Sequence, residues 1–256
     1  MTQRAVLAVQ DDDDGQEALP GRRAMAGGDA LPAGRADDGQ EALPDGRDGR
    51  DLAALLAHRR SVRRLRDGPF PATARHHILR AATLTPAAYN RPPWHIVLLD
   101  ERRAEFWHLV EQVFRERLDG DRLERYLARL RGFRGGVAVL LVYEDRQNVD
   151  AMRDAWRIDA RTAHSFADQG LGMVQLALWL AVVAEGLATS LQHWEDLIAD
   201  RLVAFLGHSP ERFVLAAVMP VGYAAEEPRA VERPDPRHII SLNAFGTAGE
   251  GKTTPP

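Results

Sequence analysis

The chain has 256 residues, of which 45% are hydrophobic and 27% charged, as in an ordinary globular protein. It contains no Cys, which excludes disulfides, thiolate zinc sites and cysteine nucleophiles and is consistent with a cytoplasmic location. Residues 1–50 hold 6 Arg and 11 Asp or Glu and so account for the net charge of −4. The remainder is close to neutral, so we expect no binding to nucleic acid.

Residues 1–50 are predicted to be a disordered, low-complexity acidic tail. They lack aromatic residues, and the octapeptide DDGQEALP occurs twice, at 13–20 and 37–44. The tail is either simply solvated or binds a partner. The first ten residues are followed by four Asp rather than a small-residue cleavage site, so no signal peptide is expected.

The predicted folded domain covers residues 51–243 and is followed by a flexible tail at 244–256. Apolar residues at helical spacing predict a helix over 51–62 and another over 71–86, with Thr73 as the N-cap of the second. A strand is predicted at 94–100. One or two helices follow over 102–133, with a break near 119–121.

The second half of the domain contains the most apolar segments. The run at 135–145 predicts a strand buried on both faces, and 212–224 predicts another. Residues 162–187 form a predicted helix that is apolar nearly all round, which indicates burial in a core or an interface. Its longest apolar run, 176–184, is too short to span a bilayer, so no membrane association is expected.

An extended piece at 188–194 and an amphipathic helix at 195–208 connect that long helix to the last strand. Helices and strands alternate along the domain. This order predicts an α/β or α+β fold with a central sheet.

Three short segments combine residues that suit ligand binding. RRSVRRLRD, at 59–67, offers guanidinium groups and a hydroxyl that bind phosphate well, although such a run is also typical of a solvated basic surface. TPAAYNRPPW, at 85–94, is stiffened by two prolines and forms either a rigid start to a strand or a wall for a flat ligand. GLATSLQHWED, at 186–196, either satisfies its own backbone or presents donors to a ligand.

Other motifs do not point to chemistry. GLGMVQ, at 170–175, lacks a third Gly and does not follow a strand, so it indicates helix packing rather than a dinucleotide site. The nine His are scattered, and no metal site is expected.

Taken in this order, with the late strand VLAAVMPVGYAAEEP and the following RPDPRHII, the segments resemble the nitroreductase family of FMN-dependent oxidoreductases. They are most similar to a subset that includes the yeast fatty-acid-repression nitroreductases. The resemblance covers residues 52–243. It implies an α+β fold, with a central mixed or antiparallel sheet flanked by helices, in an entwined homodimer that holds two FMN molecules at its interface.

The resemblance also assigns residues to the cofactor. Arg59, Arg60, Ser61 and Arg63 match the motif that holds the FMN phosphate and ribityl chain, and Pro86, Ala88 and Asn90 match the loop against the isoalloxazine ring. Leu191, Gln192 and His193 match the turn that faces the flavin near N5, and Arg237 matches a C-terminal basic residue that touches the phosphate. The chain departs from the family pattern at Ala87, Ala88 and Pro92.

The implied activity is the reduction of nitroaromatic, quinone or similar flat acceptors by NADH or NADPH, with hydride transfer through flavin N5 in a ping-pong cycle. His193 is a candidate proton donor. One alternative is an FMN-dependent dehydrogenase or oxidase of a biosynthetic pathway. The other is a non-catalytic binding or stress-response protein that keeps the fold.

Overall fold

The computed structural model describes residues 48–228, 230–235 and 239–241, which belong to one compact unit beginning at Asp45. The predictions for the acidic tail before residue 48, for the tail at 244–256 and for Arg237 lie outside the described residues. The first described helix begins at Asp48, three residues before the predicted domain boundary at residue 51.

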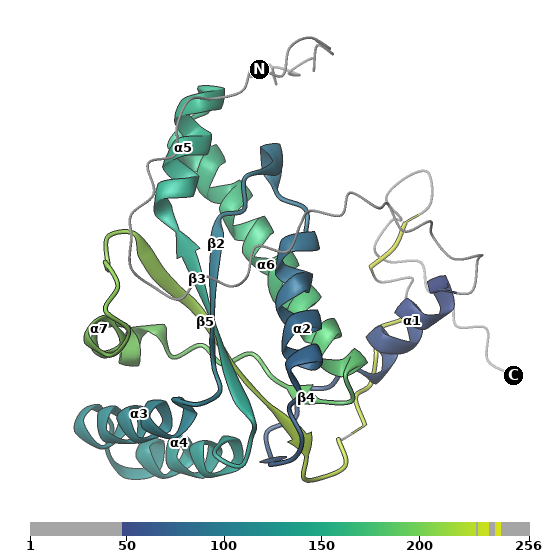
Figure 1. Ribbon diagram of the computed structural model, residues 1–256, viewed down its shortest axis with the longest axis vertical. Coiled ribbons are helices and arrows are strands. Elements are labelled where there is room, and N and C mark those ends of the chain that lie inside the picture. The colour runs from purple at the N-terminus through teal and green to yellow at the C-terminus, as the bar shows by residue number, and fades with distance from the viewer. Residues whose placement is uncertain (1–47, 229, 236–238, 242–256) are drawn as a thin grey trace, which may run out of the picture. The chain divides into compact units, whose positions relative to one another are not determined.

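The elements follow one another along the chain as shown in Figure 1. Their order is α1 (Asp48–His58), β1 (Leu65–Arg66), α2 (Ala72–Leu84), η1 (Ala88–Asn90), β2 (Trp94–Leu99), α3 (Arg103–Arg117), α4 (Gly120–Phe133), β3 (Ala138–Asp145), α5 (Arg146–Trp156), α6 (Ala160–Ala184), β4 (Ala188–Thr189), α7 (Glu195–Leu206) and β5 (Phe213–Ala224).

The strands form one sheet in the order β1-β5-β3-β2, and β4 also pairs with β5. Every pairing between these named strands is antiparallel. Helices therefore do not connect parallel neighbours as they do in α/β folds, and the class is α+β. This confirms the predicted antiparallel sheet flanked by helices.

The central strand β3 is buried on both faces, as its continuous apolar sequence predicts. Val139, Leu141 and Tyr143 contribute to a core on one face, and Leu140 and Val142 to a second core on the other. The alternation follows from the two-residue repeat of a strand. The register between β3 and β5 shifts beside Val142 and Tyr143, at a β-bulge.

Each face of the sheet is covered by a different set of helices. Helices α3, α4 and α7 pack on the first core, and α2 and α6 pack on the second (Figure 1). The break predicted near 119–121 is confirmed, because α3 ends at Arg117 and α4 starts at Gly120. The predicted packing role of Gly170 is also confirmed, since a Cβ there would lie 2.9 Å from Pro93 Cγ.

Two details of the predicted helices are wrong. The first helix stops at His58 rather than continuing to residue 62, so the arginine-rich segment is extended. Thr73 does not cap α2, because the N-cap is Pro71 and no side chain there accepts a hydrogen bond. Helix α5 was not predicted at all, although Asp145 caps it by accepting a hydrogen bond from the Gln147 N–H at 3.2 Å.

Helix α6 is the one described helix whose length and apolar composition would allow it to cross a membrane, a property it shares with core helices of soluble folds. Leu171, Val174, Leu178 and Val182 bury one side of it on the sheet. Its other side is partly open, with Met173 42% exposed. The predicted all-round burial is thus incomplete within a single chain.

A buried carboxylate at the end of β3 yields a stability prediction. The Asp145 side chain is 4% exposed and accepts hydrogen bonds from Arg212 Nε at 3.1 Å and Nη2 at 3.0 Å. Arg212→Ala is expected to lower the free energy of unfolding by about 1–3 kcal/mol, because it leaves a buried charge with fewer donors. Urea denaturation monitored by circular dichroism measures this. The matched change Arg201→Ala breaks only an exposed ion pair with Glu116 and should cost less than about 1 kcal/mol.

Candidate functional site

The arginine-rich segment after α1 runs as an extended chain beside the end of the sheet. Ser61 forms a parallel bridge with Thr189, and the Val62 N–H donates to the Thr189 carbonyl oxygen at 3.2 Å. Val62 is buried while Ser61 and Arg63 are exposed. Alternation along an extended chain therefore turns the Ser61 and Arg63 side chains away from the core on the same side.

Glycines let this segment lie directly against its neighbours. A Cβ at Gly132 would lie 2.2 Å from the Arg63 carbonyl oxygen, and a Cβ at Gly135 would lie 2.3 Å from that of Leu65. Both distances are far below van der Waals contact with a backbone atom. Side chains at these two positions would push the segment off the end of α4 and the following turn.

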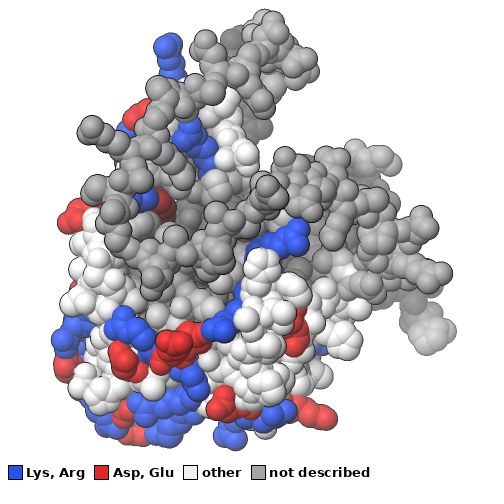
Figure 2. Space-filling model, in the orientation of Figure 1, with Lys and Arg blue, Asp and Glu red and all other residues white. Residues whose placement is uncertain are grey.

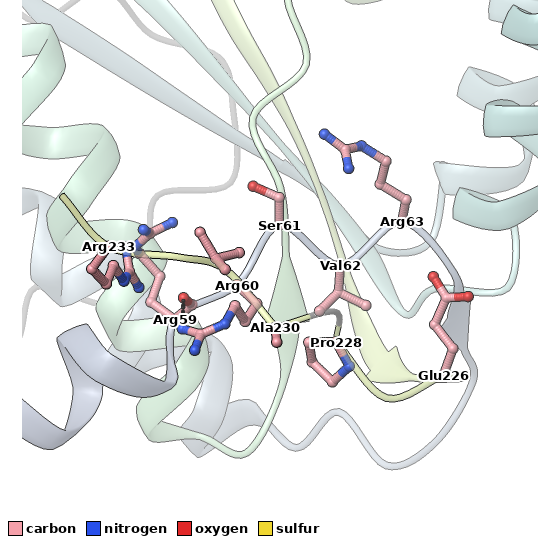
Figure 3. Close-up of a pocket in the computed structure, with 10 residues that line it drawn as sticks. Arg59, Arg60, Ser61, Val62, Arg63, Glu226, Pro228, Ala230 and Arg233 are labelled. Atoms are coloured by element: carbon pink, nitrogen blue, oxygen red, sulfur yellow. Dashed lines mark hydrogen bonds between the residues drawn. The ribbon is translucent and has the colours of Figure 1, made fainter.

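The segment lines a cavity of about 600 Å³. Figure 3 shows Arg59, Arg60 and Arg233 gathered toward one end of the cavity, with Ser61 in the middle and Arg63 at the other end. The remaining lining residues are Val62, Glu226, Pro228, Ala230 and Val231. The lining thus contains four arginines and one acidic residue, a balance of charge that favours an anion.

The three arginines of the segment that line the cavity, Arg59, Arg60 and Arg63, form no ion pair with a carboxylate within the described part of the chain. The Arg59 guanidinium lies 4.6 Å from the Trp179 ring centroid, and Arg60 donates to the carbonyl oxygens of Ala57 and Arg59. Glu226 instead lies 3.6 Å from Arg64, which is outside the cavity lining. Guanidinium donors without acidic partners suit the oxygens of a phosphate group.

Sequence reasoning missed one arginine of this cavity. Arg233 belongs to its lining, whereas the predicted C-terminal contact, Arg237, is outside the described residues. Both lie in the proline-rich segment after β5, where the sequence offers several basic residues and no periodicity to choose between them. The general signal, a basic residue beyond the last strand, was present.

The predicted flavin loop is a tight turn between α2 and β2. Ala88–Asn90 form a short 3₁₀ helix in which the Asn90 N–H donates to Ala87 O at 3.0 Å. Tyr89 and Asn90 both have φ of 52°, a left-handed conformation that Asn tolerates well and Tyr adopts seldom. Pro86 and Asn90 are exposed, and Ala88 packs against the small core formed by α5 and α6.

Aromatic contacts hold this unusual turn. The Tyr89 ring stacks on Trp156 at the end of α5, with 4.4 Å between centroids and 15° between planes, and it meets Phe166 edge-on at 6.1 Å. Stacking of this kind contributes about 0.5–1.5 kcal/mol beyond burial, which is comparable to the cost of a left-handed residue. The loop therefore presents a fixed surface that includes two exposed aromatic rings.

The predicted turn at 191–193 lies beside β5. Gln192 is buried, and its main-chain N–H and C=O both pair with Val218 at 2.9 Å. Its side-chain amide donates to Ser190 Oγ and to Leu191 O. These contacts occupy Gln192, so in this turn only the N–H groups of Leu191 and His193 lack a described acceptor. The His193 imidazole is exposed, with Nδ1 3.0 Å from Glu195 Oε1.

The sheet register separates the loop from the arginine cavity. Trp94, which ends the loop, pairs with Glu144, and Glu144 pairs with Val214. Thr189, which contacts Ser61, pairs with Val221. Six residues of β5 lie between these two points, a distance of roughly 20 Å along the strand. The Gln192 turn, opposite Val218, is much nearer the cavity than the loop is.

The comparisons with known proteins agree with this architecture. Residues 56–223 match the model of the nitroreductase family. No curated protein sequence is significantly similar to the chain.

Solved structures share the fold at low sequence identity. CinD from Lactococcus lactis, solved with chloramphenicol, has a TM-score of 0.67 and 19% identity, covering 75% of this chain and 100% of that one. An FMN complex of a protein assigned as a nitroreductase from Desulfovibrio desulfuricans has a TM-score of 0.57 and 20% identity, covering 76% and 98%. A gut-bacterial enone reductase, CLA-ER, has a TM-score of 0.54 and 19% identity, covering 76% and 98%.

The predicted similarity to the yeast fatty-acid-repression subset stays a prediction, since these matches do not distinguish subsets. The family match includes the arginine segment, the loop, the Gln192 turn and all five strands but the last residue of β5. On this evidence the chain belongs to the nitroreductase family.

Proposed function

We propose that the protein is an FMN-dependent oxidoreductase that uses NADH or NADPH to reduce flat acceptors such as nitroaromatics or quinones. The observation that carries the proposal is the cavity in which four arginines and Ser61 converge, on a nitroreductase-family fold. The FMN complex of the Desulfovibrio relative supports the choice of cofactor.

The residues present fit the phosphate end of FMN. Four guanidinium groups against the single carboxylate of Glu226 favour a dianionic phosphate monoester. Two buried polar atoms near the arginine segment also lack described partners. They are the Thr189 hydroxyl, next to Ser61, and the Trp179 indole N–H, in the ring beneath Arg59. Such atoms are rare in native folds and are consistent with a missing ligand or water.

Bound FMN would supply the redox chemistry, by accepting a hydride equivalent from the nicotinamide and passing electrons to the acceptor. Arg59, Arg60 and Arg63 would hold the phosphate and the ribityl chain between them, and Ser61 would donate a hydrogen bond to a phosphate or ribityl oxygen. The free N–H groups of Leu191 and His193 would orient the polar edge of the ring. Tyr89 and Asn90, in their rigid turn, would limit water and shape the space for a flat acceptor.

We further propose that two copies of the chain complete each site. The span of roughly 20 Å between the loop and the cavity exceeds the distance between the phosphate and the ring of FMN. We therefore expect one chain to supply the arginine cavity, called the cradle below, and its partner to supply the loop. The partly exposed apolar side of α6, including Met173 and Leu176, is a surface that a second copy would cover.

The visible absorption spectrum of the purified full-length chain tests the cofactor. We expect an oxidised-flavin spectrum that survives removal of excess FMN and bleaches when NADH or NADPH is added without oxygen. A chain that retains no flavin after incubation with FMN would refute the proposal. Retained flavin that only an organic substrate can reduce would favour the dehydrogenase or oxidase alternative.

Mixed dimers test the shared site. Arg63→Ala damages the cradle, and Asn90→Trp is designed to block the loop, so homodimers of either variant are expected to lose most FMN-dependent activity. Mixing the two after partial denaturation should restore activity to about a quarter of the wild-type value. This follows because half of the dimers are mixed, and each mixed dimer has one site with two intact halves. Absence of recovery, in a mixture shown by mass spectrometry to contain mixed dimers, would argue against two-chain sites.

A further inference from the structure

A second, smaller cavity lies on the opposite face of the sheet from α2 and α6. It has a volume of about 170 Å³ and is lined by His95, Val97, Tyr143, Leu206, His208 and Phe213. None of these residues lines the arginine cavity or belongs to the flavin loop. The volume is close to the roughly 150 Å³ of a protein cavity that accepts one benzene molecule.

The walls of this cavity are mainly aromatic. The Tyr143 and His208 rings meet at 5.1 Å between centroids with 66° between planes, and His95 and Phe213 lie at 4.9 Å. Val97 and Leu206 supply the aliphatic part of the lining. These tilted and edge-to-face arrangements leave ring edges and faces with which the flat ring of a ligand in the cavity can make edge-to-face contact.

Two polar atoms in this lining are buried without a described partner. The Tyr143 hydroxyl belongs to a side chain whose residue is only 2% exposed, and Nδ1 of His208 is also fully covered. A buried hydroxyl without a partner is costly, so a ligand or water that pairs with it is favoured. The two atoms together offer a donor and an acceptor to the same small molecule.

The cavity is also uncharged near neutral pH. Burial raises the pKa of the Tyr143 hydroxyl, and burial lowers the pKa of His208. Burial is also the main cause that lowers the pKa of His95, although the nearby carboxylate of Asp145 opposes it. The two charged groups that act on His95, Asp145 and Arg212, pair with each other. The lining thus favours a neutral ligand over an ion.

We propose that this cavity binds a neutral, single-ring aromatic molecule that carries a hydroxyl or similar hydrogen-bonding group, with the ring between the aromatic walls and the polar group on Tyr143 and His208. The site is separate from the proposed flavin site and does not depend on the proposed function. A phenol matches it best, because its oxygen accepts from Tyr143 while its proton is donated to His208 Nδ1.

Three fluorinated probes of similar shape test the proposal by ¹⁹F NMR titration of the full-length chain saturated with FMN. They are 4-fluorophenol, fluorobenzene, which lacks the polar group, and 4-fluorobenzoate, which is an anion. We expect 4-fluorophenol to bind at least about fivefold more tightly than either of the other two, as one or two net hydrogen bonds allow.

Two variants locate the binding. Tyr143→Phe removes only the hydroxyl, which has no described partner to lose, so the fold should be kept, and 4-fluorophenol affinity should fall about fivefold. Leu206→Trp places a large side chain in the lining and should abolish binding of the phenol. Tyr126→Phe, on α4 and outside the lining, is the matched control and should change nothing.

An affinity for 4-fluorophenol that Tyr143→Phe leaves unchanged would overturn the assignment, whatever the effect of Leu206→Trp. Failure of the wild-type chain to bind the phenol would overturn it as well. So would a crystal soaked with phenol in which the cavity holds only ordered water. Loss of FMN binding would bear on the proposed function alone, since the two cavities share no lining residue.

Discussion

Arg63→Ala is expected to weaken FMN binding by about tenfold to a hundredfold, the range that loss of one hydrogen bond to a charged group implies. Arg63 occupies one end of the cavity (Figure 3), and no described carboxylate neutralises it. The other three arginines lie toward the far end, so none of them readily replaces it. Titration of FMN followed by quenching of flavin fluorescence measures the dissociation constant.

The control for this experiment is Arg129→Ala. Arg129 is exposed on α4 and lies outside the cavity lining, and its replacement by alanine removes the same charge as Arg63→Ala does. Figure 2 shows acidic and basic side chains interspersed over the described part of the visible face, so long-range charge effects should be small. If both variants weakened FMN binding equally, the contact would be a general charge effect and the cradle would be misassigned.

Gly132→Ala is expected to lower the free energy of unfolding by about 2–3 kcal/mol, the cost of forcing an extra methyl group into a closed space. The new Cβ would lie 2.2 Å from the Arg63 carbonyl oxygen, and backbone cannot swing aside as the end of a side chain can. Relief requires the arginine segment to move. The variant should therefore also lose FMN affinity, although position 132 does not line the cavity.

Gly172→Ala is the matched substitution. It also replaces a helical glycine, but no described atom of the same chain lies within 4 Å of the added Cβ. It should raise the free energy of unfolding by up to about 1 kcal/mol, because alanine loses less conformational entropy in a helix. Urea unfolding of both variants measures the difference. Equal stability of the two would contradict the close contact at Gly132.

The sequence was most informative where one physical requirement dominates. The apolar run of β3 predicts a strand covered on both faces, and the polar residues at 119–121 predict the break that separates α3 from α4. Helix α5 was missed because it is mostly polar and follows β3 without a loop. The main sequence signal for the start of α5 is its N-cap, Asp145, but this residue is also the last one of β3 and was assigned to the end of that strand.

The candidate site was predicted in its parts and not in its arrangement. The RRSVR segment was recognisable because arginines and a serine in one extended run suit a phosphate. Its distance from the Asn90 loop depends on the register of β2, β3 and β5, in which Trp94 pairs with Glu144 and Glu144 pairs with Val214. No local sequence pattern predicts that register. Arg233 could not be chosen over Arg237, since a proline-rich segment has no repeat that fixes which side chain turns inward.

The Tyr89–Trp156 stack gives the protein a built-in optical probe. Trp156 is 53% exposed, whereas the other four tryptophans, Trp94, Trp107, Trp179 and Trp194, are each 8% exposed or less. Long-wavelength tryptophan emission, and the part of the emission that acrylamide quenches, will therefore come almost entirely from Trp156. This indole packs on the turn beside the proposed acceptor space. An acceptor that packs against that fixed turn would shield Trp156, so acceptor binding could be followed in real time without a label.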